Sequence, residues 1–307
     1  MTRDLVEPVL FLVFNRPETT VRVFEAIRAA KPPRLYVAAD GPRTGYQGEA
    51  ECCAEVRRIA TAIDWPCEVK TLFRESNLGC RDAVSSAVTW FFDNETEGII
   101  LEDDCLPCLD FFLFAQTLLE RYRNDIRVMQ ICGGNFSSGL KFGRASYYFS
   151  KYAHIWGWAS WRRAWQHYDV DMKDLPSFLS CRMLECIFPW QPVVQRRWEQ
   201  ILRKTYERSP DFNTWDCQWT YALFKQGGLC LFPNLNLVMN IGGDGTHNVN
   251  AKLMSIPFGS LGEISHPEFP LPDLEADRLL YNTFYANRNF FIRLFLRGRR
   301  ELQRIFQ

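Results

Sequence analysis

The chain has 307 residues, of which 47% are hydrophobic and 23% are charged, and its 36 basic residues balance its 36 acidic residues. This length suits one large domain or a domain and a half, and the composition is that of a globular protein, not of a disordered or membrane-embedded one. The zero net charge gives no reason to expect nucleic acid as a partner.

Strand-like and helix-like segments alternate over the first hundred residues. Short apolar runs predict strands at residues 9–14, 34–39, 67–73 and 98–101, and amphipathic stretches predict helices at 18–30, 49–63 and 82–92. Such repeated β-α units with short connections predict a doubly wound, mostly parallel α/β sheet flanked by helices.

The pattern loosens after about residue 125. Strands are expected at 128–132 and 228–232, a helical or irregular segment rich in Trp and Arg at 150–215, and a glycine-rich polar loop at 240–250. We therefore expect one domain over 1–250, with a nucleotide-sugar-binding half at 1–125 and an acceptor half at 126–250. Residues 251–307 would form a C-terminal extension.

The eleven cysteines and the two chain ends bear on location. The cysteines are odd in number, and their single C-x-x-C, Cys105 to Cys108, has no second pair at zinc-ligand spacing, so free thiols in a reducing cytoplasm are expected.

The first eight residues do not form a signal peptide, and no apolar run is long enough to cross a membrane. From Arg288 to Gln307, six Arg and one Glu alternate with apolar residues. This pattern predicts a basic amphipathic helix that either contacts the inner face of a membrane peripherally or docks on the domain.

Three consecutive carboxylates, Glu102, Asp103 and Asp104, follow the fourth predicted strand directly. Ligands bind at the carboxyl edge of open α/β sheets, and three adjacent acids there call for a hard divalent cation such as Mg²⁺ or Mn²⁺, which would in turn hold a diphosphate. The alternative is an acidic start to the helix that Asp110 opens.

The loop after the first strand, Phe14-Asn15-Arg16-Pro17, excludes several nucleotide-binding classes. It lacks G-x-G-x-x-G, and the chain has no G-x-x-x-x-G-K-[ST] loop, so neither a dinucleotide enzyme nor a P-loop NTPase is expected. A sugar nucleotidyltransferase would want a glycine-rich phosphate loop here, where this chain has arginine and proline.

The order of motifs resembles a GT-A fold glycosyltransferase. These motifs are Phe14-Asn15-Arg16-Pro17, Asp40-Gly41-Pro42, Arg74-Glu75-Ser76-Asn77-Leu78-Gly79 and Leu101-Glu102-Asp103-Asp104, the last in the place of a D-x-D motif. The E-D-D sequence followed by a proline and by Asp110-Phe111-Phe112 is similar to the N-acetylglucosaminyltransferase I type. The resemblance covers about residues 8–250 and implies a bacterial-style relative without that group's membrane anchor.

The resemblance assigns a role to each acid. It makes Asp104 the direct metal ligand, turns Asp103 toward the ribose or a water beyond the metal, and turns Glu102 toward the sugar or the end of the sheet. One carboxylate with diphosphate oxygens and waters suits Mn²⁺ or Mg²⁺, which would neutralise the leaving nucleoside diphosphate.

Residues at neighbouring strand ends complete the expected donor site. Phe14, Arg16 and Asp40 follow the first two strands, where the resemblance puts a uracil and a ribose, and Arg81 and Asp82 are candidates for base or phosphate contacts. Structural roles are the alternative for three of them: a surface salt bridge for Arg16, an ordinary turn for Asp40, and helix capping for Asp82.

Asp216 matches the family's general base, which takes a proton from the acceptor hydroxyl during inversion. Its neighbours Trp215 and Trp219 could raise its pKa and pack against a sugar. A helix N-cap shared with Asp211 or Thr214 is the alternative.

Two later segments add further candidates. His247 lies in Gly242-Gly243-Asp244-Gly245-Thr246-His247, a loop that the resemblance brings back over the diphosphate, with Asp244 as the fallback; a lone loop histidine can also simply be exposed. Trp156 and Trp158, around Gly157, could stack on a sugar or pack in the core.

The sequence thus predicts an inverting, metal-dependent glycosyltransferase that moves a sugar from a nucleotide-diphosphate donor, with a UDP-sugar favoured, to a glycan or lipid-linked acceptor. Two alternatives remain: a non-catalytic sugar- or nucleotide-binding scaffold of the same fold, and a metal-dependent phosphatase with an aspartate nucleophile. The phosphatase is disfavoured because the acids do not follow the first strand.

Overall fold

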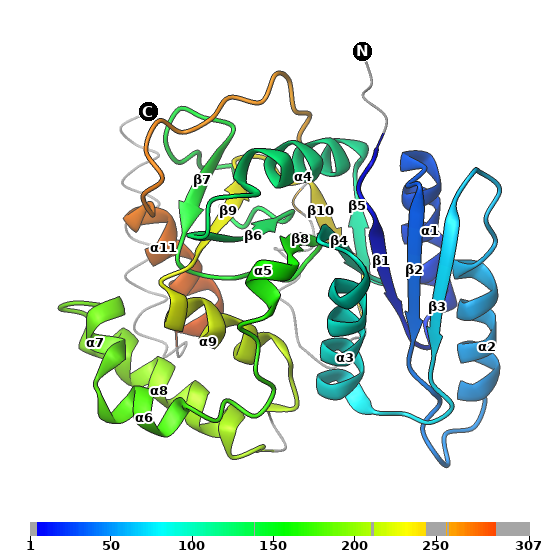
Figure 1. Cartoon of the computed structure of the whole chain (residues 1–307), viewed down its shortest axis with the longest axis horizontal. Helices are drawn as coiled ribbons and strands as arrows, with labels where there is room; N and C mark the ends of the chain where they lie inside the picture. Colours follow the sequence, from blue (N-terminus) through cyan, green and yellow to red (C-terminus); the bar gives the residue numbers. More distant parts are fainter. Residues whose placement is uncertain (1–4, 138, 210–211, 244–255, 257, 287–307) are drawn as a thin grey trace.

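A single eight-stranded sheet with helices on both faces forms the frame of the protein (Figure 1). The computed structural model describes residues 5–137, 139–209, 212–243, 256 and 258–286. The strand order is β3-β2-β1-β4-β8-β6-β9-β7. The strands are β1 (Val9–Val13), β2 (Arg34–Ala39), β3 (Glu68–Phe73), β4 (Glu97–Glu102), β6 (Val128–Cys132), β7 (Tyr147–Ser150), β8 (Trp158–Trp161) and β9 (Leu229–Pro233).

The sheet is mostly parallel, as the sequence predicts. Strands β1 to β4 pair in parallel, as do β6 and β9, whereas β8 and β7 pair antiparallel with their neighbours, so six of the eight strands run in one direction. The carboxyl ends of β1, β2, β3 and β4 therefore meet at one edge. This architecture confirms the predicted fold class, a Rossmann-like, mostly parallel α/β sheet flanked by helices.

The helices of the first half also lie close to their expected bounds. They are α1 (Pro17–Ala30), α2 (Glu49–Ala60), α3 (Gly79–Asn94) and α4 (Leu109–Tyr122). Contacts link α1 to α2 and α4 on one face of the sheet, and α3 to α5 (Arg162–Trp165) on the other. Helix α3 begins at Gly79, three residues before the expected start at Asp82, so Asp82 is not its capping residue.

The second half contains strands that sequence patterns did not reveal. The stretch at 150–215, expected to be helical or irregular, contributes β8 and the last residue of β7 as well as α5, α6 (Leu175–Ser180), α7 (Met183–Ile187) and α8 (Pro192–Tyr206). It is followed by α9 (Asp216–Gln226) and by β10 (Val238–Asn240), which pairs antiparallel with β5 (Cys105–Pro107) from the first half of the chain. Near the end of the described chain, α11 (Leu274–Leu280) and a π-helix (Tyr281–Tyr285) pack on the core.

Tryptophans from β8, α5 and α9 form much of the second-half core. Trp158 is fully buried and stacks on Trp215 at 5.7 Å between ring centroids, and Trp165 lies 5.1 Å from Trp219. Of the two roles expected for Trp158, the structure shows packing in the core, because neighbouring rings cover it and leave no face for a sugar. Gly157, with φ +57°, admits the side chain of Val238: a Cβ there would lie 2.8 Å from Val238 Cγ2.

Two further sequence expectations can be compared with the structure. All eleven cysteines lie in the described part of the chain and all are free thiols, as predicted. Among the described helices, none combines the length and the apolar character needed to cross a bilayer. The basic stretch 288–307 lies outside the described residues.

Candidate functional site

The acidic motif lies where the sequence placed it, at the carboxyl edge of the sheet. Glu102 is the last residue of β4, and Asp103 and Asp104 form the turn into β5. That turn is fixed from the far side of the chain, because the Ile241 N–H after β10 donates to the Asp104 carbonyl at 2.7 Å. A segment from the second half of the chain thus fixes the position of the acidic motif, which belongs to the first half.

Arg16 joins two of the acids. It follows β1, and its guanidinium donates through Nη1 to Asp104 Oδ2 at 3.0 Å and through Nη2 to Asp103 Oδ1. The Phe14 N–H donates to the other oxygen of Asp103 at 3.2 Å. The structure therefore brings together four of the predicted residues, Phe14, Arg16, Asp103 and Asp104. The ion pair between Arg16 and Asp103 is not the surface salt bridge considered as the alternative, since the Asp103 side chain is only 3% exposed.

Burial and mutual repulsion shift the ionisation of these acids. Burial, followed by the Asp104 and Asp103 charges, raises the pKa of Glu102 well above its ordinary value. Burial raises the pKa of Asp103 to about 6, although Arg16 opposes this rise. Glu102 Oε1 is buried without a hydrogen-bond partner. A buried carboxyl oxygen with no partner is costly, so the site is suited to a proton or a cation that satisfies it.

Asp40, at the end of β2, holds the start of α3. Its carboxylate accepts from the N–H groups of Leu78 and Gly79 at 2.9 and 3.1 Å and from Asn77 Nδ2 at 2.8 Å. Negative charge at a helix N-terminus is stabilising, and α3 has no capping side chain of its own. Asp40 is thus more than a turn residue, and it fixes the segment next to the predicted nucleotide position.

Helix α3 carries the remaining two candidates of this edge. Arg81 Nε lies 3.2 Å from Asp82 Oδ1, and the Arg81 side chain is only 11% exposed whereas Asp82 is 50% exposed. Asp82 therefore points into solvent beside its partner. The pair binds within its own helix and does not join the Arg16 cluster.

Cys80, which no sequence pattern indicated, marks the place where the acids converge. Desolvation raises the pKa of its thiol to about 12, and the charges of Glu102, Asp216, Asp40 and Asp104 add to that rise. Four acids from three separate segments therefore act on the N-terminal turn of α3. Local sequence could not single out Cys80, because the neighbours that matter are distant in the chain.

Asp216 is the first residue of α9 and accepts a hydrogen bond from Thr214 Oγ1. Its charge contributes to the raised pKa of Glu102, so the predicted base lies within electrostatic range of the acidic motif. The residue before α9 is Trp215, which makes no capping bond, so the N-cap interpretation of Asp216 is not supported. Trp215 and Trp219 are fully buried and form the wall behind this helix.

The glycine-rich loop starts directly against the Arg16–Asp104 pair. A Cβ added to Gly242 would lie 2.6 Å from Asp104 Oδ2 and 2.8 Å from Arg16 Nη1. The two candidates further along, Asp244 and His247, lie outside the described residues.

The donor set can be compared with what a divalent cation needs. In the described part of the chain, no three His, Cys, Asp or Glu side chains converge on one metal position. A cation held by Asp104 would therefore need most of its ligands from diphosphate oxygens and water, which is how Mg²⁺ and Mn²⁺ are commonly bound beside nucleotides. The unsatisfied Glu102 Oε1 and the oxygen-only character of the motif fit such an ion.

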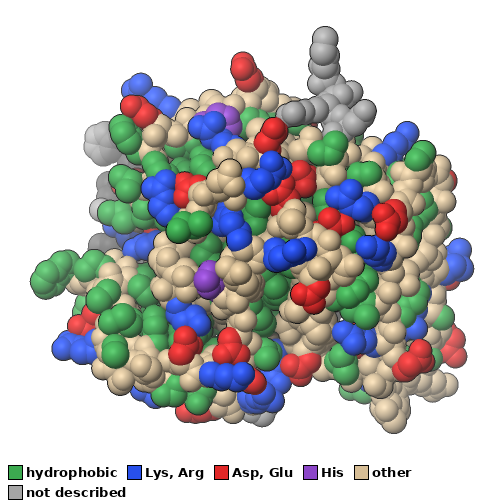
Figure 2. Space-filling view, viewed as in Figure 1, with side chains coloured by type: hydrophobic (Ala, Val, Ile, Leu, Met, Phe, Trp, Pro, Cys, Tyr) green, Lys and Arg blue, Asp and Glu red, His purple; other side chains and the backbone are tan. Residues whose placement is uncertain are grey.

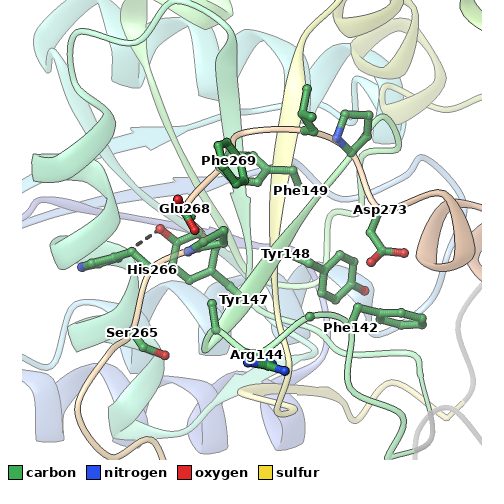
Figure 3. Close-up of a pocket in the computed structure, with 15 residues that line it drawn as sticks. Phe142, Arg144, Tyr147, Tyr148, Phe149, Ser265, His266, Glu268, Phe269 and Asp273 are labelled. Atoms are coloured by element: carbon green, nitrogen blue, oxygen red, sulfur yellow. Dashed lines mark hydrogen bonds between the residues drawn. The ribbon is translucent and has the colours of Figure 1, made fainter.

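A pocket of about 570 Å³ lies between residues 265–273 and β7, the outermost strand on the second-half side of the sheet (Figure 3). That segment is bonded to β7 at both ends, through Ser146 N–H to the Ser265 carbonyl at 3.1 Å and Asp273 N–H to the Phe149 carbonyl at 2.8 Å. None of the predicted site residues lines the pocket, so it is separate from the acidic edge.

Comparison with known proteins gives only distant likenesses. No family model and no curated protein matches the chain. Among solved structures, it is similar to HddC from Yersinia pseudotuberculosis (TM-score 0.32, 9% identity, 52% of this chain and 78% of that one). It is also similar to a UDP-glucose pyrophosphorylase complexed with UDP-glucose (0.31, 11%, 53% and 78%) and to an apo UDP-glucose pyrophosphorylase (0.35, 8%, 76% and 93%). A functional assignment therefore rests on the residues of the site.

Proposed function

We propose that this protein is an inverting, metal-dependent glycosyltransferase. It would take a sugar from a nucleoside-diphosphate donor, with a UDP-sugar favoured, and pass it to a glycan or lipid-linked acceptor. The observation that carries the proposal is the meeting of Arg16 with Asp103 and Asp104 at the carboxyl edge, where the charge of Asp216 also acts on the neighbouring Glu102.

The donor diphosphate is the ligand that best fits the Arg16–Asp104 pair. Arg16 offers a delocalised cation suited to phosphate oxygens, and Asp104 offers a carboxylate to a divalent cation. Mn²⁺ or Mg²⁺ bound there would supply charge neutralisation of the leaving diphosphate. A cation held by Asp104 would compete with Arg16 for that carboxylate and would free guanidinium hydrogen bonds for phosphate.

Asp216 is the residue we assign to the acceptor side. Inversion at the anomeric carbon requires a base on the face opposite the leaving group. Asp216 comes from α9, in the second half of the chain, whereas Arg16, Asp103 and Asp104 come from the first. A base and a phosphate-binding group on separate halves can flank a sugar from its two sides.

The first experiment is titration calorimetry of UDP, GDP and their common sugars, with and without Mn²⁺. We expect one nucleotide to bind in a metal-dependent way and Asp104→Ala to abolish that binding. Asp125→Ala is the matched control, because Asp125 pairs with Arg127 at 2.7 Å just before β6, at the amino edge of the sheet.

Three alternative outcomes would separate the competing functions. No nucleotide binding by the folded protein would contradict the proposal and return attention to a phosphatase. Binding without release of nucleoside diphosphate in the presence of glycan acceptors would indicate a non-catalytic scaffold. Formation of nucleotide sugar from a nucleoside triphosphate and a sugar phosphate would indicate a nucleotidyltransferase.

A further inference from the structure

Trp190 is the most exposed large hydrophobic side chain among the described residues. It lies in the turn between α7 and α8 and is 97% exposed, whereas the other nine tryptophans, all in the described part of the chain, are buried or half-buried. Its backbone has φ +61°, a left-handed conformation that favours glycine over a bulky aromatic residue. Local folding therefore gives no reason for a tryptophan at this position.

The turn that carries Trp190 is anchored to the core of the protein. Phe188, just before it, is 1% exposed and stacks on Tyr152 at 5.9 Å between centroids. The Phe188 carbonyl accepts from Gln195 Nε2 at 2.7 Å and from the Gln191 N–H at 3.2 Å, which closes the turn. Hydrophobic side chains project from the margin of the molecule at this end of α7 and α8 (Figure 2), and Val193 beside the turn is 64% exposed.

The surroundings of the turn are basic although the whole chain is neutral. Residues 181–208 contain six Lys or Arg and three Glu. Arg196 is exposed, and its side chain has no hydrogen bond or ion pair with another described residue. Helix α8 is also bonded to the end of the described chain, since Arg197 Nε donates to the Tyr285 carbonyl at 2.7 Å. The sequence that begins two residues later, 287–307, contains six Arg and one Glu.

We propose that the α7–α8 turn docks the protein on an anionic lipid surface, with Trp190 and Val193 entering the interface. Tryptophan favours the boundary between lipid headgroups and hydrocarbon, and basic residues around it are attracted to anionic lipids. A protein partner would need a broad apolar patch, whereas this turn offers two projecting apolar side chains close in sequence to the exposed Arg196. Two weak membrane-binding elements together can hold a protein at a membrane, and the basic sequence that follows Tyr285 is the second such element.

The test is binding of the full chain to vesicles of phosphatidylcholine alone and of phosphatidylcholine mixed with phosphatidylglycerol, measured by co-sedimentation. We expect binding to the anionic vesicles only. Trp190→Gly, which also relieves the left-handed backbone, should weaken partitioning roughly tenfold, as expected for loss of one large apolar side chain from the interface. Phe269→Ala is the control, since Phe269 is 65% exposed and belongs to the segment that lines the pocket beside β7.

Acrylamide quenching of tryptophan fluorescence gives an independent readout. Because Trp190 is the one highly exposed indole, the vesicles should protect it from the quencher in the wild type, with little further protection in Trp190→Gly. Absence of vesicle binding, or equal binding by wild type and Trp190→Gly, would overturn the proposal. So would a concentration-dependent dimer that Trp190→Gly abolishes, because it would show a second copy as the occupant.

Discussion

Arg16 Nη1 lies 3.0 Å from Asp104 Oδ2, so that the loop after β1 and the turn after β4 share one ion pair. The two strands are neighbours in the sheet, and the pair sits at their common carboxyl edge. A cation and a carboxylate held in contact at this position can respond together to an incoming diphosphate, since each has a natural partner in a metal–diphosphate complex.

Gly242→Ala tests how closely the later loop packs on this pair. Its new Cβ would lie 2.6 Å from Asp104 Oδ2, so Arg16 or Asp104 must shift. We expect weaker metal-dependent nucleotide binding by calorimetry and a free energy of unfolding lower by about 1–3 kcal/mol, the usual range for overpacking. Gly243→Ala is the matched control, because no atom of the described residues lies within 4 Å of its added Cβ. Equal behaviour of the two variants would contradict this description of the loop.

Asp40→Ala tests the anchoring of α3. Removal of the carboxylate leaves the Leu78 and Gly79 N–H groups without their acceptor. The expected loss of unfolding free energy is about 1–2 kcal/mol, comparable with loss of a helix cap. Urea denaturation measures it, with Asp82→Ala as a control expected to change stability by less than about 0.5 kcal/mol, because Asp82 forms an exposed pair with Arg81. A larger loss in Asp82→Ala than in Asp40→Ala would reverse the assignment.

Glu7→Gln tests the pH dependence of stability away from the site. Burial, and then the Glu97 charge, raises the pKa of Glu7 from 4.5 to about 7. The folded state therefore retains a proton that the unfolded chain releases above pH 4.5, so the contribution of Glu7 to stability is complete below that pH and declines as the pH rises to 7. The decline is at most about 3 kcal/mol.

The measurement is urea denaturation of wild type and Glu7→Gln from about pH 5 to about pH 8. The variant should lose less stability across this range than the wild type. Glu185→Gln, at an exposed pair with Arg182, should keep the wild-type profile. Parallel profiles for Glu7→Gln and wild type would show that Glu7 is already ionised at low pH in the folded protein.

Asp216→Asn tests the proposed base. We expect nucleotide binding close to that of the wild type and a turnover lower by about 10²–10⁴-fold, the contribution typical of general base catalysis. Release of nucleoside diphosphate with an acceptor present measures turnover. Asp174→Asn is the control, since Asp174 accepts hydrogen bonds from Tyr221 and Lys225, which lie on α9, the helix that begins at Asp216. Turnover of Asp216→Asn within a few-fold of wild type would remove Asp216 from the mechanism.

The first half of the chain could be predicted because its signals are local. Each strand from β1 to β4 is a short apolar run closed by a turn, and β2 has the expected bounds of residues 34–39. Parallel pairing then sends the ends of β1, β2 and β4 to one edge, which is why Arg16, Asp40 and the acids Glu102 to Asp104 were found together. The strands β7 and β8 escaped prediction, since four-residue segments buried on both faces show no alternation of polar and apolar residues.

Local sequence is enough to show which chemical groups are available: three carboxylates at a strand end, an arginine after the first strand and an aspartate next to Trp215. How these groups meet depends on the folded chain. It paired Arg16 with Asp103 and Asp104, gave Asp40 to the N-terminus of α3, and buried Trp158 in the core. The physical reason is that contacts, burial and the resulting pKa shifts depend on residues far apart in the chain, whereas strand and turn propensities depend on near neighbours.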